Sequence, residues 1–334
     1  MNIAILGAGA WGTALAIGLC PRHEVTLWVR DPAHFKEMAG TRINRRHLDP
    51  FALPPSLLLS NDLGSAIAKA DLAVIAVPMS GLREIFRLVA GSGLGIPVIW
   101  VSKGFESGTS KLPHQVAIEE YDAIAPIGVL SGPSFAREVA EGLPVALTLA
   151  SNDREFASNT AAALHNHRIR IYSSEDLVGV EVGGAVKNVM AIAAGISDGL
   201  GLGANARAAL ITRGLAEITR LGLKLGGRLE TFLGLSGVGD LTLTCTGDLS
   251  RNRTVGLMLA KGKPLTEILE ELGATAEGVY TAKEVEQLAE RLGVDMPITK
   301  AVCSVLYEGV PADCAVEELM KRDPKAENNL GLPM

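Results

Sequence analysis

Cysteine is scarce in this sequence, and its spacing matches no metal site and no redox pair. The four cysteines are Cys20, Cys245, Cys303 and Cys314, and none of them belongs to a CxxC pair or a zinc-ligand pattern. A disulfide framework and a structural zinc site are therefore not predicted. We expect reduced thiols, a cytoplasmic location and no requirement for a metal ion.

A large net charge and long uninterrupted hydrophobic runs are also missing. The 31 basic and 37 acidic residues give a net charge of −6 without a basic block, which argues against nucleic acid and stable membrane association as partners. No apolar run approaches the roughly 18 residues that a membrane-spanning helix needs. An anionic small molecule is compatible with this balance, because one local basic pocket is enough to hold it.

Glycine, by contrast, is abundant, with 37 residues in a chain of 334. This share exceeds the usual level of about 7% and predicts many tight turns and close backbone contacts. Apolar residues make up 48% of the chain, so a disordered protein is excluded. At roughly 150 residues per domain, the length predicts two domains, each with a core of its own.

The first half of the chain alternates short apolar runs with helix-like stretches, which is typical of a parallel sheet covered by helices on both faces. The predicted strands are Asn2–Leu6, Val25–Val29, Leu72–Val77, Val98–Val101, Ile127–Leu130 and Val145–Leu149. After residue 175 the segments become long and rich in Ala and Leu, and the predicted helices are Val178–Gly199, Ala204–Leu223, Leu265–Leu272 and Ala282–Leu292. The predicted architecture is a Rossmann-type, doubly wound α/β domain over residues 1–177, a mostly helical domain over 178–325 and a flexible tail over 326–334.

The first predicted strand leads into Gly7-Ala8-Gly9-Ala10-Trp11-Gly12, a complete G-x-G-x-x-G motif followed by a predicted helix over Thr13–Leu19. The first glycine permits a tight turn, the second lets a pyrophosphate approach the backbone, and the third allows close packing of helix against strand. The helix N-terminus adds free N–H groups and the positive end of its dipole. The motif predicts a dinucleotide-binding site, with a merely structural glycine-rich turn as the alternative.

The end of the second strand indicates which dinucleotide is held. An acidic residue there binds the ribose hydroxyls of NADH, whereas an arginine pairs with the 2′-phosphate of NADPH. Here Arg30 is followed by Asp31, so the sequence favours NADPH and leaves NADH open, with a solvated Arg30 as the alternative. No flavin-contacting signature accompanies the motif, so FAD is not expected.

Two later turns place polar residues directly after predicted strands, where open α/β sheets bind their ligands. Lys103 lies in Val101-Ser102-Lys103-Gly104, and Ser131-Gly132-Pro133-Ser134-Phe135-Ala136 opens a short helix whose N-terminus could meet cofactor or substrate oxygens. A surface lysine and a capped helix start without a ligand are the alternatives.

One lysine lies inside an otherwise apolar predicted helix. In the stretch Gly183–Ile192, Lys187 and Asn188 are surrounded by small and apolar residues. Burial without a partner lowers the pKa of an ammonium group, and a proton donor works best when its pKa is near the working pH. The pattern therefore marks Lys187 as a candidate acid–base residue, with a structural lysine that reaches solvent as the alternative.

The last cluster combines Gly237-Val238-Gly239-Asp240 with Ser250-Arg251-Asn252-Arg253, in which Ser250 is suited to cap a helix. Arg251 and Asn252 then lie in the first turn of that helix, where an arginine fork beside free N–H groups suits a phosphate. Asp240 is a candidate partner for Lys187, although the spacing does not give their distance. A solvated arginine-rich loop is the alternative.

Six motifs, in this order, carry a resemblance that covers about residues 1–320: GAGAWGTALA, VSKG, SGPSFA, AVKNVMAIAAG, GVGDLTLTC and SRNR. Together they are similar to the motifs of NAD(P)-dependent glycerol-3-phosphate dehydrogenases of the bacterial type. The resemblance implies reversible reduction of dihydroxyacetone phosphate to sn-glycerol 3-phosphate with NADPH or NADH, which supplies glycerophospholipid synthesis. It also implies a homodimer.

The resemblance assigns roles to the residues that match the family motifs. It makes Lys187 the general acid toward the carbonyl oxygen, or the base toward the hydroxyl in the reverse direction, supported by Lys103, Asp240 and Thr244. The substrate-binding residues that it implies are Lys103, Gly132, Ser134, Lys187, Asn188, Asp240, Ser250, Arg251 and Asn252. The cofactor-binding residues, from the glycine motif and the resemblance together, are Gly7, Gly9, Ala10, Trp11, Gly12, Arg30, Lys103, Ala136, Arg251, Thr275 and Glu277. Thr275 departs from the pattern, because the family commonly has valine there.

Two other functions are left open by the sequence. A related two-domain dehydrogenase of a 2- or 3-hydroxy acid, or a ketopantoate-type reductase, would bind a carboxylate in place of the phosphate. A nucleotide-sensing module that has lost catalysis would bind the cofactor and turn over no substrate. The presence of Lys103, Lys187 and Asp240 argues against the sensing module.

Overall fold

The fold was determined as a computed structural model, which describes residues 1–121, 125–273, 276–324 and 326–327. The chain divides into two compact units, one of residues 1–102 and 113–177 and the other of residues 103–112 and 178 onward. The segment 103–112 precedes the predicted domain boundary in sequence but packs with the second unit. The tail predicted over 326–334 lies outside the described residues, except for Ala326 and Glu327.

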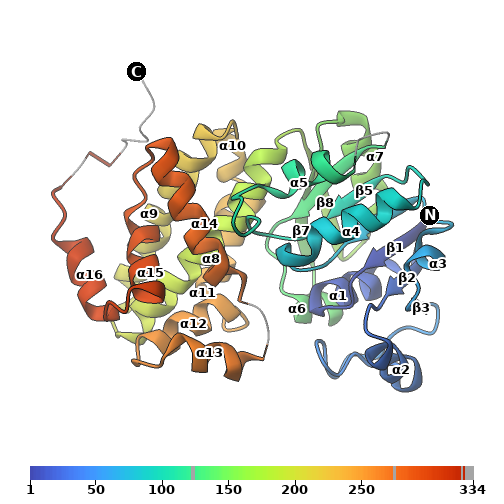
Figure 1. The fold of residues 1–334 in the computed structure, drawn as a ribbon, viewed down its shortest axis with the longest axis horizontal. Helices are drawn as coiled ribbons and strands as arrows, with labels where there is room; N and C mark the ends of the chain where they lie inside the picture. Colours follow the sequence, from blue (N-terminus) through green and yellow to red (C-terminus); the bar gives the residue numbers. More distant parts are fainter. Residues whose placement is uncertain (122–124, 274–275, 325, 328–334) are drawn as a thin grey trace. The chain divides into compact units, whose positions relative to one another are not determined.

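The first unit contains an eight-stranded sheet in the order β3-β2-β1-β4-β5-β6-β7-β8 (Figure 1). Its strands are β1 (Asn2–Leu6), β2 (Glu24–Trp28), β3 (Leu58–Ser60), β4 (Leu72–Ile75), β5 (Val98–Trp100), β6 (Ile127–Ser131), β7 (Val145–Ala150) and β8 (Ile169–Ser174). Neighbouring strands are parallel except β6 and β7, which pair antiparallel. The predicted α/β sheet is confirmed, and β3 and β8 are added to it.

Helices cover both faces of this sheet. They are α1 (Ala10–Leu19), α2 (Pro32–Thr41), α3 (Leu63–Ile67), α4 (Met79–Gly91), α5 (Pro113–Glu120), α6 (Ala136–Ala140) and α7 (Arg154–Leu164). In β5, Ile99 joins the hydrophobic cluster that contains α1 and α7, whereas Trp100 lies edge-on against Phe86 of α4, with ring centroids 5.7 Å apart. Because successive strand residues point to opposite faces, α4 lies on the other side of the sheet from α1 and α7.

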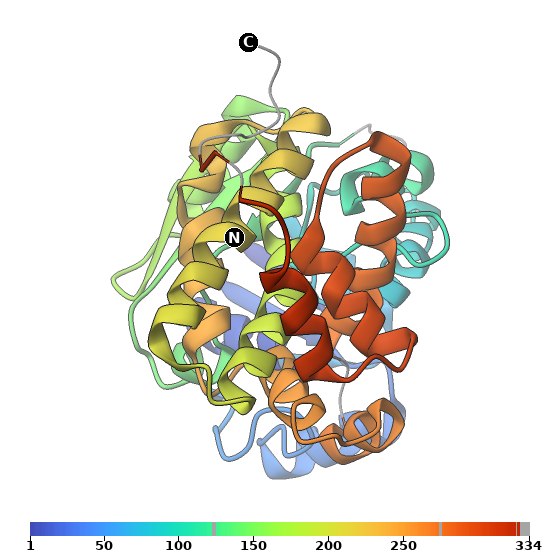
Figure 2. The ribbon, with the colours of Figure 1, turned by 90° about the vertical axis from the view of Figure 1, so that its left-hand side faces the viewer.

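The second unit is helical, as predicted. Its elements are α8 (Leu177–Gly199), α9 (Gly203–Lys224), α10 (Leu229–Phe232), the π-helical turn η1 (Leu235–Gly239), α11 (Asp240–Thr246), α12 (Arg251–Leu259), α13 (Leu265–Leu272), α14 (Glu277–Leu292), α15 (Pro297–Tyr307) and α16 (Ala312–Met320). Figure 2 shows the last three helices, of which α14 packs against α15 and α15 against α16. One element, α8, supplies much of the hydrophobic core.

Among the described residues, α8 alone has the length and apolar composition of a membrane span. Its most apolar window is 94% buried inside the protein, and a core helix passes the same test. Lys187 and Asn188 interrupt its apolar residues, which is why no uninterrupted run is visible in the sequence. The apolar composition of α8 is therefore explained by its burial in the core of the second unit.

Candidate functional site

In the glycine-rich turn between β1 and α1, Gly7 and Gly12 leave no room for a side chain, whereas Gly9 has open space beside it. Gly7 has a φ of 126°, and a Cβ there would lie 2.5 Å from the carbonyl oxygen of Ala76. A Cβ at Gly12 would lie 2.1 Å from the carbonyl oxygen of Gly7, whereas a Cβ at Gly9 would meet nothing within 4 Å. Gly9 is also the N-cap of α1 and offers no side chain to the N–H groups there. This open, uncapped helix start fits the pyrophosphate of a dinucleotide.

Three further residues predicted to bind the cofactor gather around one small hydrophobic cluster of the first unit. Ala10 and Trp11 form the first turn of α1, Ala136 begins α6, and all three are half-buried against this cluster. The turn before α6 contains Gly132, whose φ is 134°, and Ser134, whose hydroxyl donates a hydrogen bond to the Gly132 carbonyl at 3.0 Å. The structure thus places the two predicted ligand-facing turns of this unit on adjacent helices, α1 and α6.

At the end of β2, Arg30 and Asp31 have different surroundings. The Arg30 side chain is 71% exposed and lies 3.5 Å from Glu84. Asp31 caps α2 by accepting from the backbone N–H of Ala33 at 2.8 Å, and it pairs with Arg46 at 2.7 Å. These hydrogen bonds hold the pKa of Asp31 below its usual value. Arg30 is therefore accessible to a ligand, whereas Asp31 already has two partners.

In the second unit, two lysines share one buried carboxylate. Lys187 Nζ lies 2.5 Å from Asp240 Oδ1, and Lys103 Nζ lies 2.7 Å from Asp240 Oδ2. Lys187 also donates to the hydroxyl of Thr244 at 2.9 Å, and that hydroxyl donates to the Asp240 carbonyl at 2.6 Å. Only 1% of the Asp240 side chain is exposed, against 8% for Lys187 and 18% for Lys103. The four residues that the resemblance marks as catalytic are therefore in direct contact.

Burial lowers the pKa of Lys187 to about 8. The charge of Asp240 opposes this shift by stabilising the ammonium form, and the positive charge of Lys103 adds to it. A pKa near the physiological range suits a group that gives up and regains a proton during turnover. The electrostatics of this cluster therefore match an acid–base role.

Close packing between α8 and η1 explains how these residues meet. A Cβ at Gly183 would lie 2.3 Å from the carbonyl oxygen of Ser236, so only glycine allows η1 to approach α8 this closely. Lys187 follows Gly183 by four residues and lies on the same face of α8. Asp240 directly follows η1 and begins α11, with Thr244 one turn later. The small-residue pattern around Lys187 is thus the packing surface that brings Asp240 to it.

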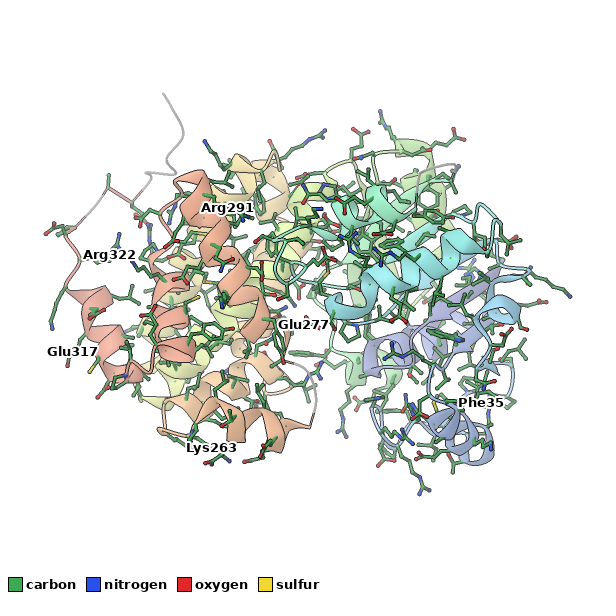
Figure 3. The ribbon with its side chains drawn as sticks, viewed as in Figure 1. Phe35, Lys263, Glu277, Arg291, Glu317 and Arg322 are labelled. Atoms are coloured by element: carbon green, nitrogen blue, oxygen red, sulfur yellow. The ribbon has the colours of Figure 1, made fainter. Side chains whose placement is uncertain are left out.

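A chain of amide hydrogen bonds begins at Asn188, the residue that follows Lys187 in α8. Asn252 donates to the side-chain oxygen of Asn188 at 3.0 Å and accepts from the backbone N–H of Gly278 at 3.0 Å. A Cβ at Gly278 would lie 2.6 Å from the Asn188 carbonyl oxygen. Glu277 is the first residue of α14 and is half-buried (Figure 3), whereas Thr275 lies outside the described residues.

The predicted helix cap at Ser250 is present, because its hydroxyl accepts from the backbone N–H of Arg253 at 3.2 Å. Arg251 is the first residue of α12, and its side chain is exposed. Sequence reasoning gave no role to Arg253, which binds Asp198 of α8 at 2.7 Å. The one signal in the sequence that distinguishes Arg251 from Arg253 is their spacing, because residues two apart face different sides of a helix.

Metal-ligand groups and disulfides are also tested by the structure. Within residues 1–121, 125–273, 276–324 and 326–327, no three His, Cys, Asp or Glu side chains are grouped to hold a metal ion. Cys20, Cys245 and Cys303 are buried free thiols, and Cys314 is an exposed one. That the protein needs no metal stays a prediction.

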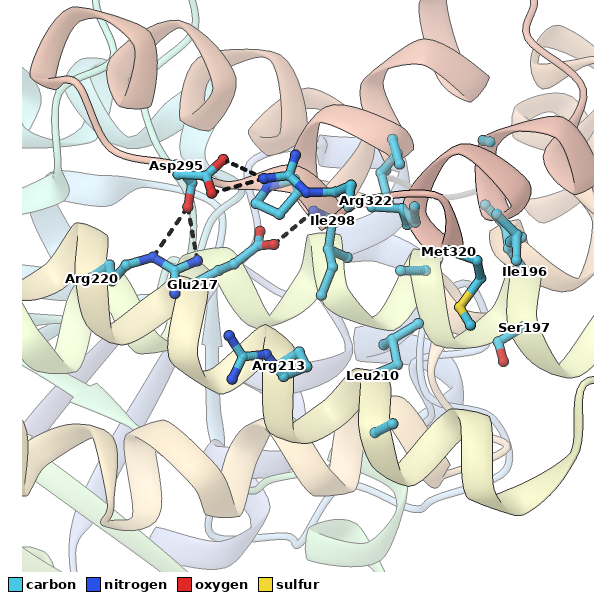
Figure 4. Close-up of a pocket in the computed structure, with 18 of the residues that line it drawn as sticks. Ile196, Ser197, Leu210, Arg213, Glu217, Arg220, Asp295, Ile298, Met320 and Arg322 are labelled. Carbon is cyan, nitrogen blue, oxygen red and sulfur yellow. Dashed lines mark hydrogen bonds and ion pairs between the residues drawn. The ribbon is translucent and has the colours of Figure 1, made fainter. Parts of the chain in front are cut away.

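A cavity of about 1150 Å³ in the second unit contains none of the predicted site residues (Figure 4). Glu217 lies at its polar end and accepts from the backbone N–H groups of Ile298 and Thr299, at 2.7 and 3.2 Å. Arg220 donates to the carbonyl oxygen of Asp295 at 2.8 Å. These bonds join α9 to the start of α15, so the polar groups at this end of the cavity are accounted for by contacts between the two helices.

Comparison with known proteins relates both units to one family. A model described as the N-terminus of NAD-dependent glycerol-3-phosphate dehydrogenase matches residues 2–157, and the corresponding C-terminal model matches residues 176–317. A curated relative from Nitrosospira multiformis, named glycerol-3-phosphate dehydrogenase (NAD(P)+), is 65% identical over 98% of this chain and 99% of its own.

Solved structures agree at the level of the fold. A glycerol-3-phosphate dehydrogenase structure from Coxiella burnetii is 42% identical, covers 96% of this chain and 99% of its own, and superposes with a TM-score of 0.92. A ketopantoate reductase structure from Ralstonia eutropha is 16% identical over 95% of this chain and all of its own, with a TM-score of 0.60. The second likeness concerns the fold alone.

Proposed function

The chain belongs to the NAD-dependent glycerol-3-phosphate dehydrogenase family, and from that premise we propose that it reversibly reduces dihydroxyacetone phosphate to sn-glycerol 3-phosphate with a nicotinamide coenzyme. The observation that carries this proposal is the buried cluster in which Lys187 and Lys103 share Asp240. Such a cluster places a titratable ammonium group in a site of low exposure, where it can stabilise the charge that builds on a carbonyl oxygen during reduction.

Lys187 is proposed as the general acid. The coenzyme, when bound, supplies the hydride. Negative charge then builds on the carbonyl oxygen of the substrate, where the Lys187 ammonium stabilises it and delivers a proton. Asp240 and Thr244 occupy two of the three N–H bonds of Lys187, so they aim the third at the substrate. In the reverse direction, the neutral amine accepts the proton of the substrate hydroxyl.

The phosphate of the substrate is proposed to bind at the start of α12. Arg251 is exposed there, beside a helix N-terminus capped by Ser250. A guanidinium group and helix N–H groups together suit a phosphate, and holding the phosphate aims the distant carbonyl. Asn188 and Asn252, joined by a hydrogen bond, are proposed to contact the same substrate. Lys103, Gly132 and Ser134 complete the proposed substrate contacts.

NADPH is proposed as the preferred coenzyme, bound through the glycine turn and Arg30. The exposed guanidinium of Arg30 suits a 2′-phosphate. Asp31 already caps α2 and pairs with Arg46, so the ribose hydroxyls of NADH would have to share its carboxylate with these two donors. Lys103, Ala136, Arg251 and Glu277 are proposed as further coenzyme contacts, on the strength of the family motifs.

The remaining proposals concern the protein in the cell. We expect a cytoplasmic homodimer whose product supplies glycerophospholipid synthesis, without a nucleic-acid or membrane partner. Light scattering on the purified protein measures the oligomeric state directly. A mass of one chain at micromolar concentration would contradict the dimer.

The activity is tested by the rates of NADPH and NADH oxidation with dihydroxyacetone phosphate, and with ketopantoate as a carboxylate control. We expect oxidation that depends on dihydroxyacetone phosphate, a higher rate with NADPH and none with ketopantoate. Protein that is folded and binds coenzyme but oxidises neither coenzyme would overturn the proposed reaction. Activity with ketopantoate alone would favour the carboxylate reductase.

A further inference from the structure

A buried polar network lies behind the glycine-rich turn of the first unit. Asn44, in the loop after α2, donates to the carbonyl oxygen of Ala8 at 2.9 Å and to the hydroxyl of Thr13 at 2.8 Å. Its side-chain oxygen lies 2.9 Å from His34 Nε2. Asn44 and Thr13 are fully buried, and His34 is 5% exposed. Such a network is costly to bury unless every member is satisfied, so its position calls for a reason.

The orientation of the Asn44 amide follows from its partners. The Ala8 carbonyl oxygen can only accept, so the atom facing it must be the Asn44 nitrogen. That nitrogen has two hydrogens, one for Ala8 and one for Thr13, and the Asn44 oxygen is then left to accept from His34. Three hydrogen bonds to groups inside the protein, two donated and one accepted, therefore hold the side chain in one position.

Fixing the Ala8 carbonyl also fixes the next N–H group. In a trans peptide the C=O and N–H bonds point in opposite directions. Because Asn44 holds the Ala8 oxygen on the buried side, the N–H of Gly9 points away from Asn44. Gly9 is the residue of the turn with open space around it, and no backbone hydrogen bond among the described residues uses its N–H.

We propose that Asn44 is a positioning residue for the coenzyme, because it sets the Ala8–Gly9 peptide so that the Gly9 N–H is presented to the pyrophosphate. Without this hold, a peptide next to glycine turns over at little cost, since glycine tolerates conformations that other residues do not. A turned peptide would present the Ala8 oxygen to the phosphates and repel them. This inference rests on the dinucleotide site proposed above.

The network also connects α2 to the glycine-rich turn. His34 lies in α2, whose N-cap is Asp31, the residue after Arg30. Thr13 lies in α1, one turn after Gly9. Through Asn44, the helix that follows Arg30 is therefore fixed to the turn that receives the pyrophosphate.

The test replaces Asn44 with aspartate, which has the same shape but presents an oxygen to the Ala8 oxygen. The matched control is Asn166→Asp, because Asn166 is also buried in the first unit and also donates to a backbone carbonyl, that of Gly18 at the C-terminal end of α1, at 3.2 Å. Titration calorimetry gives the dissociation constants of NADPH, ADP-ribose and 2′-AMP for each variant. Melting temperatures of the unliganded proteins are measured alongside.

We expect Asn44→Asp to weaken NADPH and ADP-ribose by about tenfold, the equivalent of one strong hydrogen bond, and to leave 2′-AMP within about twofold because it has no pyrophosphate. Asn166→Asp lowers the melting temperature and leaves all three affinities unchanged. Unchanged NADPH affinity in Asn44→Asp, or equal losses for all three ligands, would overturn the positioning role. Failure of the unmodified protein to bind NADPH would instead overturn the proposed coenzyme site.

A second variant covers the case in which Asn44→Asp does not fold. Thr13→Val keeps the size of the side chain and removes one of the two acceptors that fix the Asn44 amide. We expect a smaller loss in the same direction, about threefold for NADPH and ADP-ribose and none for 2′-AMP. Identical affinities in Thr13→Val and the unmodified protein would then overturn the proposal.

Discussion

Lys187 is subject to two opposing influences, burial and the charge of Asp240, and burial is the larger. Its pKa of about 8 gives opposite pH dependences to the two directions of the reaction. Reduction needs the protonated amine, so its kcat/KM falls as the pH rises through about 8. Oxidation needs the neutral amine, so its kcat/KM rises over the same range.

Initial rates in both directions from pH 6 to 10 measure these profiles, and a reduction rate that is flat across pH 8 would contradict the assignment. Lys103→Gln tests the cause, because removal of the nearby positive charge raises the pKa of Lys187. The fall in the reduction rate should then move to higher pH. Movement to lower pH would show that Lys103 acts on Lys187 in another way.

Removal of the Lys187 side chain tests its role most directly. Lys187→Ala should reduce kcat for reduction by at least about 100-fold, because the proton donor and its charge are both lost. Coenzyme affinity should stay within about twofold in a binding titration, since Lys187 is not among the proposed coenzyme contacts. Turnover near the level of the unmodified protein would show that another group donates the proton.

Arg251 and Arg253 make a matched pair on α12 with different expected effects. Arg251→Ala should raise the KM for dihydroxyacetone phosphate by about tenfold or more and leave the melting temperature unchanged, because the side chain is exposed. Arg253→Ala should lower the melting temperature, because Asp198, whose side chain is 11% exposed, loses one of its two arginine partners, Arg253 and Arg207. Kinetics and thermal unfolding of both variants separate the two roles, and the reverse pattern would reassign the phosphate site.

At the scale of elements, glycines allow close contacts between helices of the second unit. A Cβ at Gly256 of α12 would lie 2.1 Å from the carbonyl oxygen of Ile192 in α8. Gly256→Ala should therefore destabilise the protein by about 2 kcal/mol, because backbone atoms must move to admit the methyl group. Gly40→Ala in α2 meets nothing within 4 Å and should stabilise by up to about 1 kcal/mol. Melting temperatures of the two variants should move in opposite directions.

There are physical reasons why the sequence patterns failed to predict some elements. In β8, Ile169 and Ile171 are buried while Arg170 and Tyr172 are exposed, so this strand at the edge of the sheet lacks the continuous apolar run of the central strands. The helix predicted to start at Ala282 starts at Glu277, because its first turn contains glycine and branched residues that weaken a helical pattern. Central strands and long buried helices were predicted well, since burial imposes their composition.

At the scale of the whole molecule, sequence patterns identified the chemistry of the site better than its assembly. Lys187 could be singled out because a charge inside an apolar helix is unusual. Its partnership with Asp240 depends on contacts across 53 residues of chain, and that of Lys103 on contacts across 137. The residue pattern offered Asp240 as a candidate partner of Lys187 without their distance, and the family motifs added Lys103. The buried Asn44 carries no comparable signal, because an asparagine in a polar loop looks solvated in sequence.

The stability of the whole molecule should depend on one buried carboxyl group that lies away from the lysine cluster. Burial raises the pKa of Glu217 from 4.5 to about 7, with the N–H groups of α15 and the charge of Arg220 opposing the shift. Between these two values the folded state binds more protons than the unfolded state, so this group makes unfolding easier as the pH rises. Glu217→Gln cannot ionise and should escape this effect.

The free energy of unfolding of Glu217→Gln, relative to that of the unmodified protein, should therefore increase by about 2 to 3 kcal/mol between pH 5 and pH 8. Urea titrations of both proteins at each pH measure this difference, and groups common to the two proteins cancel in it. At pH 5 both Glu217 and its Gln replacement are uncharged in the folded protein, and Gln keeps an oxygen that accepts from Ile298. The difference in stability at pH 5 therefore measures the effect of the substitution on hydrogen bonding alone. A difference that stays constant with pH would show that Glu217 ionises in the folded protein as readily as in water.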